Sequence, residues 1–271
     1  LLALIATLGL LQLGHETTPE LVQLFAAALA LWSLAAAPFR RYRARLAAFV
    51  ALPLLAASGA PTIAVLFGIA GTVIAARSNY AQGRAYAPWI AAATVVAAVL
   101  AWWLRTWAWR VGFQANTDQL LQLGRLFLWF LWPAWLLALW TIWRWRRHLT
   151  KRHITAPLAM AIVALVACIA GGGFDRALMI GLPAFAVLAA FALPTLKRST
   201  TSAIDWFSVF AFSIAALFVW VIYAAFVTGT PAKPAANIAR LAPGFEGTFS
   251  ALPFAVAVAG TLAWIALVRW R

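Results

Sequence analysis

The hydrophobic pattern of this chain consists of long apolar runs separated by short polar segments, and nearly all the charged residues lie in those segments. An apolar run with few charges is typical of a helix that crosses a lipid bilayer, because the hydrocarbon core requires about 20 helical residues. The pattern predicts an all-α fold, a polytopic transmembrane helical bundle of about eight long spans and one short-helix hairpin. The apolar runs are residues 1–13, 20–39, 46–57, 61–76, 88–104, 126–143, 154–171, 177–195, 203–227 and 249–268.

The stretch 46–76 admits two interpretations, because Pro53 and the sequence Ser58–Pro61 interrupt it. It forms either one kinked span or two short helices that turn back on each other. The charges favour the hairpin, which places 15 of the 21 Lys and Arg residues on one side of the membrane, whereas a single span divides them 11 against 10. By the positive-inside rule, the side with fifteen is cytoplasmic.

Composition and charge narrow the class of protein further. Of the 271 residues, 65% are hydrophobic and 10% are charged, which excludes a soluble globular domain and a disordered chain. The net charge of +15 does not indicate nucleic-acid binding, because membrane orientation already accounts for basic residues in short loops. We expect basic loops such as 144–153 to anchor the topology and bind anionic membrane lipids, without a catalytic role. A single cysteine, Cys168, excludes a disulfide framework.

The first apolar run is too short to cross a membrane by itself. Residues 1–13 would form a helix of about 20 Å, whereas the hydrocarbon core is about 30 Å thick. We therefore expect the first span to begin upstream, so that residues 1–271 are a single transmembrane domain and a fragment of a longer chain.

Polar residues on the outward side are the candidates for chemistry, because the longest loops, 105–125 and 228–248, lie there. Asp175 and Arg176 follow three glycines and directly precede an apolar helix, where backbone N–H groups and an arginine would suit a phosphate. The alternative is a tight turn with a local Asp–Arg pair. Four further cations either contact an anionic lipid head group or sugar phosphate, or are simply solvated: Arg105, Arg110, Lys233 and Arg240.

His15 and Glu16 form a second polar group on the outward side, which could supply a general base or a metal ligand. A helix start with Thr18 as its cap and Pro19 in its first turn explains most of this segment. One histidine and two acids are too few for a zinc site, so we predict no cofactor, and the sequence leaves a divalent metal open. The apolar runs contain almost no ionisable residue, which disfavours an ion-coupled transporter or exporter.

The stretch Asp175–Ala190 resembles a late helix of the family 39 membrane glycosyltransferases, the aminoarabinose-transferase-like and protein-mannosyltransferase-like enzymes. Arg176 and the step Leu182–Pro183 match that helix, whereas Ala177 stands where the family usually has an aromatic residue. Ser58–Pro61 is similar to the family's outward hairpin, with a serine in place of its basic residue. The segments His15–Pro19 and Ala242–Phe245 are similar to bacterial members.

This resemblance implies a GT-C-like fold in the bacterial inner membrane. It implies an enzyme that transfers a sugar from a polyprenyl-phosphate donor to an acceptor at the outer face, with Arg176 as the contact for the donor phosphate. The family's essential acid lies in an Asp-Glu motif of the first outward loop, and this sequence has no such motif. The resemblance therefore places the acid upstream and assigns no catalytic residue here. The alternative function is a non-catalytic membrane subunit or scaffold of a larger complex.

Overall fold

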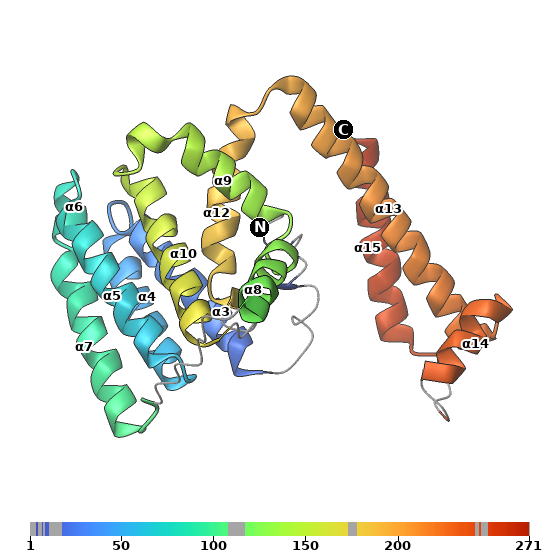
Figure 1. The fold of residues 1–271 in the computed structure, drawn as a ribbon, viewed down its shortest axis with the longest axis horizontal. Coiled ribbons are helices and arrows are strands. Elements are labelled where there is room, and N and C mark those ends of the chain that lie inside the picture. The colour runs from blue at the N-terminus through green and yellow to red at the C-terminus, as the bar shows by residue number, and fades with distance from the viewer. Residues whose placement is uncertain are drawn as a thin grey trace. The chain divides into compact units, whose positions relative to one another are not determined.

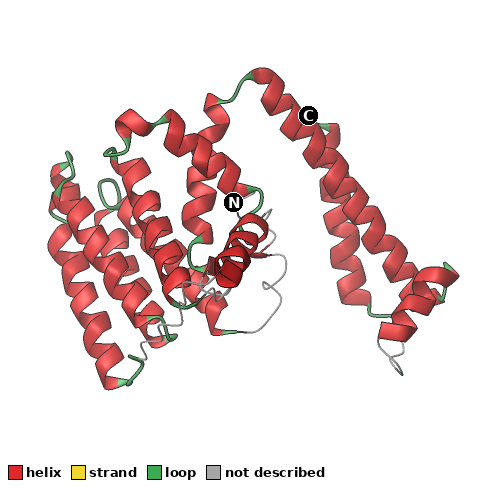
Figure 2. Ribbon diagram, in the orientation of Figure 1, coloured by secondary structure: helices red, strands yellow, loops and turns green. Residues whose placement is uncertain are grey.

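The computed structural model describes residues 4, 7, 9, 10, 18–107, 117–172, 178–241, 244 and 249–270. The regular elements of these residues are all helices (Figures 1 and 2). The chain divides into two compact units, Leu1–Thr195 (unit 1) and Leu196–Arg271 (unit 2), and each is considered by itself. The all-α fold predicted from the sequence is confirmed for the described residues.

Unit 1 contains most of the helices, and their positions agree with the predicted apolar runs. The predicted run 61–76 coincides with α5, and the bounds of α3, α7 and α10 lie within three residues of the predicted ones. The helices are α3 (Pro19–Ala36), α4 (Arg41–Ala57), α5 (Pro61–Ala76), α6 (Ala81–Arg84), α7 (Ala87–Trp103), α8 (Thr117–Phe130), α9 (Ala134–Arg144), α10 (Arg152–Ala170) and α12 (Leu182–Ala192), with short 3₁₀ turns at Arg146–His148 and Leu193–Thr195.

The stretch 46–76 forms the predicted hairpin and not a single kinked span. Gly59, at φ +101°, ends α4 in the left-handed region, and the Ala60 N–H donates to the Leu55 carbonyl at 3.2 Å, as in a glycine-terminated helix. The Gln23 amide from α3 donates to the Ser58 carbonyl at 2.8 Å and satisfies another group at this helix end. The next helix then begins at Pro61, whose missing N–H would have no partner in a first turn.

The predicted run 126–143 is divided between two helices. The α8 and α9 axes are bent by 92° at a short break, and Pro133 lies in that break. A proline within this run would remove a helical hydrogen bond and collide with the preceding turn, so the helix ends before it. The prediction of a single unbroken span over 126–143 is therefore wrong in this detail.

Five helical segments are long and apolar enough to cross a membrane, so the described chain has the character of a helical membrane protein. The bent pair α8–α9 would make a sixth, and two apolar helices are shorter, Pro61–Ala76 and Leu182–Thr195. The predicted count of about eight long spans is not confirmed. The five segments are Pro19–Ala36, Ala81–Trp103, Arg152–Ala170, Arg198–Thr228 and Ala251–Arg269.

Helices of unit 1 pack closely through small residues. On α4 and α7 a buried alanine recurs every three or four positions, which places one small face of each helix toward its neighbours. Gly68 on α5 lies directly against Thr94 on α7, so closely that a Cβ there would overlap the threonine side chain. The buried alanines of these two helices are Ala44, Ala47, Ala48, Ala51, Ala56, Ala93, Ala97 and Ala101.

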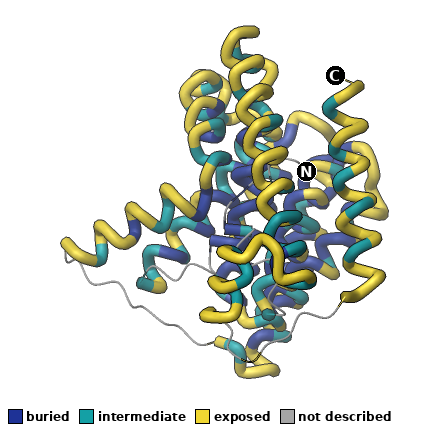
Figure 3. Tube along the Cα trace, turned by 90° about the vertical axis from the view of Figure 1, so that its right-hand side faces the viewer, coloured by how far each residue is buried: buried dark blue, intermediate teal, exposed yellow. Residues whose placement is uncertain are grey.

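Unit 2 consists of α13 (Arg198–Thr228), α14 (Ala232–Leu241) and α15 (Ala251–Arg269). Two indole N–H groups tie α13 to α15: Trp220 donates to the Thr261 hydroxyl at 3.0 Å, and Trp264 donates to the Ser213 hydroxyl at 3.2 Å. The apolar side chains of both helices are mostly exposed, as the helix that ends at the label C in Figure 3 illustrates. These surfaces suit contact with lipid.

Candidate functional site

The outward residues predicted from the sequence are only partly described. Asp175, Arg176, Arg110, His15 and Glu16 lie outside the described residues. Within the described part of the chain, no group of three His, Cys, Asp or Glu side chains could hold a metal ion.

Three of the predicted cations are described. Arg105 has φ +54° and follows the last turn of α7, where the Thr106 N–H donates to the Ala101 carbonyl at 3.0 Å. That backbone arrangement is a helix C-terminal cap, which accounts for the unusual φ angle. Lys233 and Arg240 are exposed on α14 of unit 2, and their spacing of seven residues places them on one face of that helix.

A different set of cations gathers at one end of unit 1, which we call the basic end. Three segments meet there: 37–45, which includes the start of α4; 77–87, which contains α6; and 144–153, which includes the start of α10. They contain eleven Lys and Arg residues and no Asp or Glu. The ring contact between Phe39 and Tyr80, at 6.1 Å between centroids, joins the first two segments. The positive-inside rule predicts that an end of this kind is cytoplasmic.

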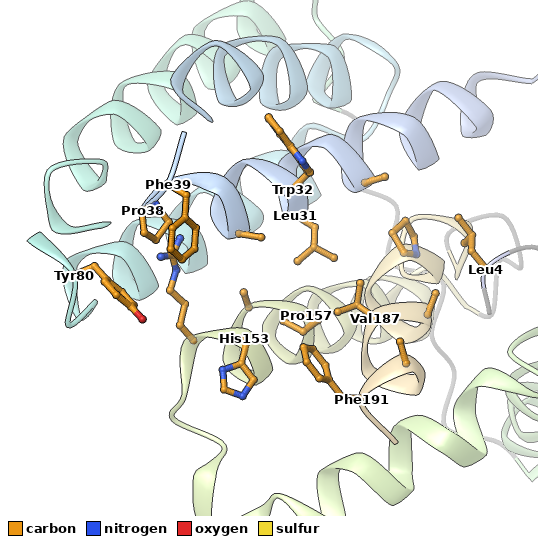
Figure 4. Close-up of a pocket in the computed structure, with 17 residues that line it drawn as sticks. Leu4, Leu31, Trp32, Pro38, Phe39, Tyr80, His153, Pro157, Val187 and Phe191 are labelled. Atoms are coloured by element: carbon orange, nitrogen blue, oxygen red, sulfur yellow. The ribbon is translucent and has the colours of Figure 1, made fainter. Parts of the chain in front are cut away.

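An apolar groove of about 620 Å³ opens at the basic end between α3, α10 and α12. In Figure 4, Leu31, Trp32, Pro157 and Val187 line its walls, and Tyr80 lies at the other end of the view from Leu4. Small residues on α3 and α12 leave the space open. The remaining lining residues are Ala28, Ala35, Pro38, Phe39, Arg152, His153, Ala156, Pro183, Ala186, Ala190 and Phe191.

A second and more polar cavity, of about 940 Å³, adjoins the groove. Tyr80, Arg152 and His153 line both cavities, so the two meet at these side chains. We call the second cavity the polar cavity. Its other lining residues are Ala70, Val73, Ile74, Arg77, Ser78, Asn79, Thr150, Lys151, Thr155 and Ala159.

Arg152 is the residue at which the two cavities join. Its Nε and Nη2 atoms are buried, and neither has a hydrogen-bond partner among the described residues. A buried charged donor without a partner is unfavourable. Arg152 also begins α10, directly after Lys151, and a helix N-terminus is the end that disfavours cations. Because no acidic residue lines either cavity, an external anion is the natural partner for this guanidinium.

Hydrogen bonds within the chain hold the segments around Arg152 in place. The Arg84 guanidinium donates to the Ser78 carbonyl at 2.9 Å, and a Cβ on Gly83 would lie 2.8 Å from the Ser78 Cβ, so a glycine is needed there. The Thr155 hydroxyl donates to the Leu149 carbonyl at 2.6 Å and fixes the start of α10. The cavity walls are therefore ordered structure before any ligand arrives.

His153 closes one side of the groove as part of an aromatic group. Its ring centroid lies 5.8 Å from that of Trp145 and 5.4 Å from that of Phe191, so it lies between the end of α9 and the end of α12. This group joins the 144–153 segment to the groove. From its sequence, the segment 144–153 is expected only to orient the chain in the membrane and to bind anionic lipids, so this site was not predicted.

The pattern that could have revealed the site is the complete absence of acids from three basic loops, with an arginine at the start of an apolar helix. Such a pattern is common at cytoplasmic membrane surfaces, so it does not separate a site from a topology signal. No protein-family model matches the chain, and no similar protein was found among curated proteins or solved structures. The resemblance to family 39 glycosyltransferases therefore stays a prediction.

Proposed function

We propose that unit 1 binds a lipid that carries a phosphate, with the phosphate at Arg152 and the hydrocarbon chain in the apolar groove. The observation that carries this proposal is the pair of buried, unpartnered nitrogen atoms, Nε and Nη2, of the half-buried Arg152 at the junction of the two cavities. Arginine pairs with phosphate through two parallel N–H donors, which suits the two unpartnered atoms.

The apolar groove gives the lipid half of this ligand. Its walls are alkyl and aromatic side chains, and polar groups gather only at the end shared with the polar cavity. A molecule with one charged end and one long apolar end matches that distribution, whereas a fully soluble anion would leave the groove unfilled. The positive charge of the basic end would attract such a lipid from the cytoplasmic leaflet.

We further propose that this lipid is the polyprenyl-phosphate sugar donor of a membrane glycosyltransferase, with an acceptor at the outer face of a bacterial inner membrane. The support for this step is the resemblance stated above, since its helix forms α12 and contributes Pro183, Ala186 and Val187 to the groove. The resemblance places the phosphate contact at Arg176 on the outward side, as transfer at the outer face requires, whereas the cavities favour Arg152 at the basic end. The two positions make different predictions.

The decisive experiment measures binding of farnesyl phosphate to the purified chain in nanodiscs of zwitterionic phosphatidylcholine, followed by tryptophan fluorescence and native mass spectrometry. Arg152→Gln should weaken binding about tenfold, the effect of losing a charge-assisted hydrogen bond. The matched control is Arg147→Gln, which removes one charge from an exposed residue outside both cavities and should change affinity less than twofold. Equal effects in the two variants would show general charge attraction and overturn the proposal.

A second pair of variants tests the groove. Ala190→Phe places a ring at an exposed lining position of α12 and should exclude the hydrocarbon chain of the lipid from the groove. Ala92→Phe makes the same change at an exposed position of α7 outside the cavities and should leave binding unchanged. Arg176→Gln completes the set: if it weakens binding and Arg152→Gln does not, the phosphate is bound on the outward side. If none of these variants weakens binding, the result favours the alternative function, a non-catalytic membrane subunit of a larger complex.

A further inference from the structure

The polar cavity is larger and more polar than one phosphate requires. Besides Arg152 it is lined by two cations, Arg77 and Lys151. Apart from Tyr80 and His153, which the groove shares, four neutral residues with polar side chains also line it. A phosphate monoester at Arg152 would fill the groove with its chain and leave the polar cavity, about 940 Å³, to water alone. The neutral residues are Ser78, Asn79, Thr150 and Thr155.

Two of those residues are occupied within the chain. The Ser78 hydroxyl accepts from the Tyr80 N–H at 3.3 Å, and the Thr155 hydroxyl donates to the Leu149 carbonyl at 2.6 Å. The Asn79 amide and the Thr150 hydroxyl make no side-chain hydrogen bond among the described residues. They lie on different segments that line the same cavity, together with the cations Arg77 and Lys151. Such a wall offers both charge and neutral donors and acceptors to one ligand.

We infer that the polar cavity is a second subsite, which binds a phosphate ester of a hydroxylated polar group. This inference rests on the proposed function, because it takes the groove and Arg152 as the site of the lipid phosphate. The ester has two sources. It is either the polar head of the same lipid, joined through a phosphodiester at Arg152, or a separate soluble organic phosphate that meets the lipid there.

The first arm of the test compares two probes with one chain, dodecyl phosphate and dodecyl phosphoglycerol, in phosphatidylcholine nanodiscs. The double variant Arg77→Gln/Lys151→Gln should weaken dodecyl phosphoglycerol about tenfold, because it removes charged donors to the glycerol hydroxyls, and should weaken dodecyl phosphate less than threefold. Asn79→Ala/Thr150→Val, which keeps every charge, should weaken only the phosphoglycerol. Arg147→Gln serves as the control for the loss of charge, and circular dichroism confirms that each variant is folded.

The second arm of the test identifies which of the two sources supplies the phosphate ester in the polar cavity. Glycerol 1-phosphate is titrated into the wild-type chain after saturation with dodecyl phosphate. Binding that Arg77→Gln/Lys151→Gln abolishes supports a soluble organic phosphate in the subsite. No binding, together with the selective loss of dodecyl phosphoglycerol in the first arm, supports the head group of the lipid itself.

The inference is overturned if the polar-cavity variants weaken both lipid probes equally and glycerol 1-phosphate does not bind. That result would leave the proposed function intact, provided that Arg152→Gln still weakens dodecyl phosphate. If instead Arg152→Gln has no effect on dodecyl phosphate, the proposed function fails, whatever the polar-cavity variants show.

Discussion

The two units of this chain are similarly apolar but use their apolar residues in different ways. In unit 1 the buried residues are largely alanines on facing helices, with leucines between them. In unit 2 no large side chain of α13 or α15 is fully buried, and the two helices are joined by aromatic contacts and two tryptophan hydrogen bonds. Close backbone packing holds the first unit, whereas long side chains bridge the second.

This difference explains why the proposed site lies in unit 1. Helices that pack through alanines hold a fixed spacing, and a groove forms where small residues meet no opposing side chain, as at Ala35, Ala186 and Ala190. The ordered walls of the groove follow from the packing around them. The following predictions test the contrast between the units, from the largest expected effect to the smallest.

The largest effect is expected at the closest helix contact. Gly68→Val should lower the free energy of unfolding by about 3 kcal/mol, because the new side chain would overlap Thr94 on α7 and force the helices apart. Gly260→Val in α15 should change it by less than about 0.5 kcal/mol, because a Cβ there meets nothing within 4 Å. Unfolding in sodium dodecyl sulfate, followed by circular dichroism, measures both. Similar losses of unfolding free energy in the two variants would contradict the prediction that helices pack more closely in unit 1 than in unit 2.

The energetic cost of a side chain at a positive φ angle should be the same in both units. Gly59 in unit 1 and Gly229 in unit 2 have φ angles of +101° and +73°, and a Cβ at either position has no close neighbour. Each glycine-to-alanine change should lower the free energy of unfolding by about 1–2 kcal/mol, the cost of the left-handed region for a side chain. The same unfolding assay applies. A large difference between the two variants would mean that packing, and not backbone conformation, fixes these positions.

A buried hydroxyl in unit 1 should have a somewhat smaller effect. Thr141 on α9 is fully buried, and its hydroxyl donates to the Leu188 carbonyl on α12 at 2.7 Å. Thr141→Val keeps the shape and removes the hydrogen bond, so the free energy of unfolding should fall by about 1 kcal/mol. Thr201→Val is the control, because its exposed hydroxyl bonds only to its own helix. If both substitutions lower the free energy of unfolding equally, the hydrogen bond between α9 and α12 makes no special contribution to stability.

The smallest effect is expected for the bridge between the helices of unit 2. A double-mutant cycle of Trp220→Phe and Thr261→Val should give a coupling of about 0.6 kcal/mol, typical of hydrogen bonds between helices in a membrane. The cycle of Trp264→Phe and Ser213→Ala should give a similar value. Couplings above about 2 kcal/mol would indicate that unit 2 is as tightly packed as unit 1.

Much of the fold could be predicted from the sequence because membrane helices are encoded locally. A long apolar run has no stable conformation in lipid other than a helix, since every backbone N–H and carbonyl group must find a partner within the segment. The hairpin at Ser58–Pro61 was also predictable, because glycine and proline mark the turn and the charges select its direction. The bend between α8 and α9 was missed, because hydropathy alone does not show where Pro133 ends a helix.

The sequence by itself determined the helical class, the positions of most helices and the gathering of basic residues in the short segments between them. Only the tertiary structure decided which of those basic residues face a cavity. Arg152 and Arg147 look alike in the sequence, because both lie in the basic segment 144–153, which contains no acid. They differ because packing of α3, α5, α10 and α12 buries two guanidinium nitrogens of Arg152 beside two cavities and leaves Arg147 exposed. Burial without a partner depends on contacts between distant segments, which no local pattern specifies.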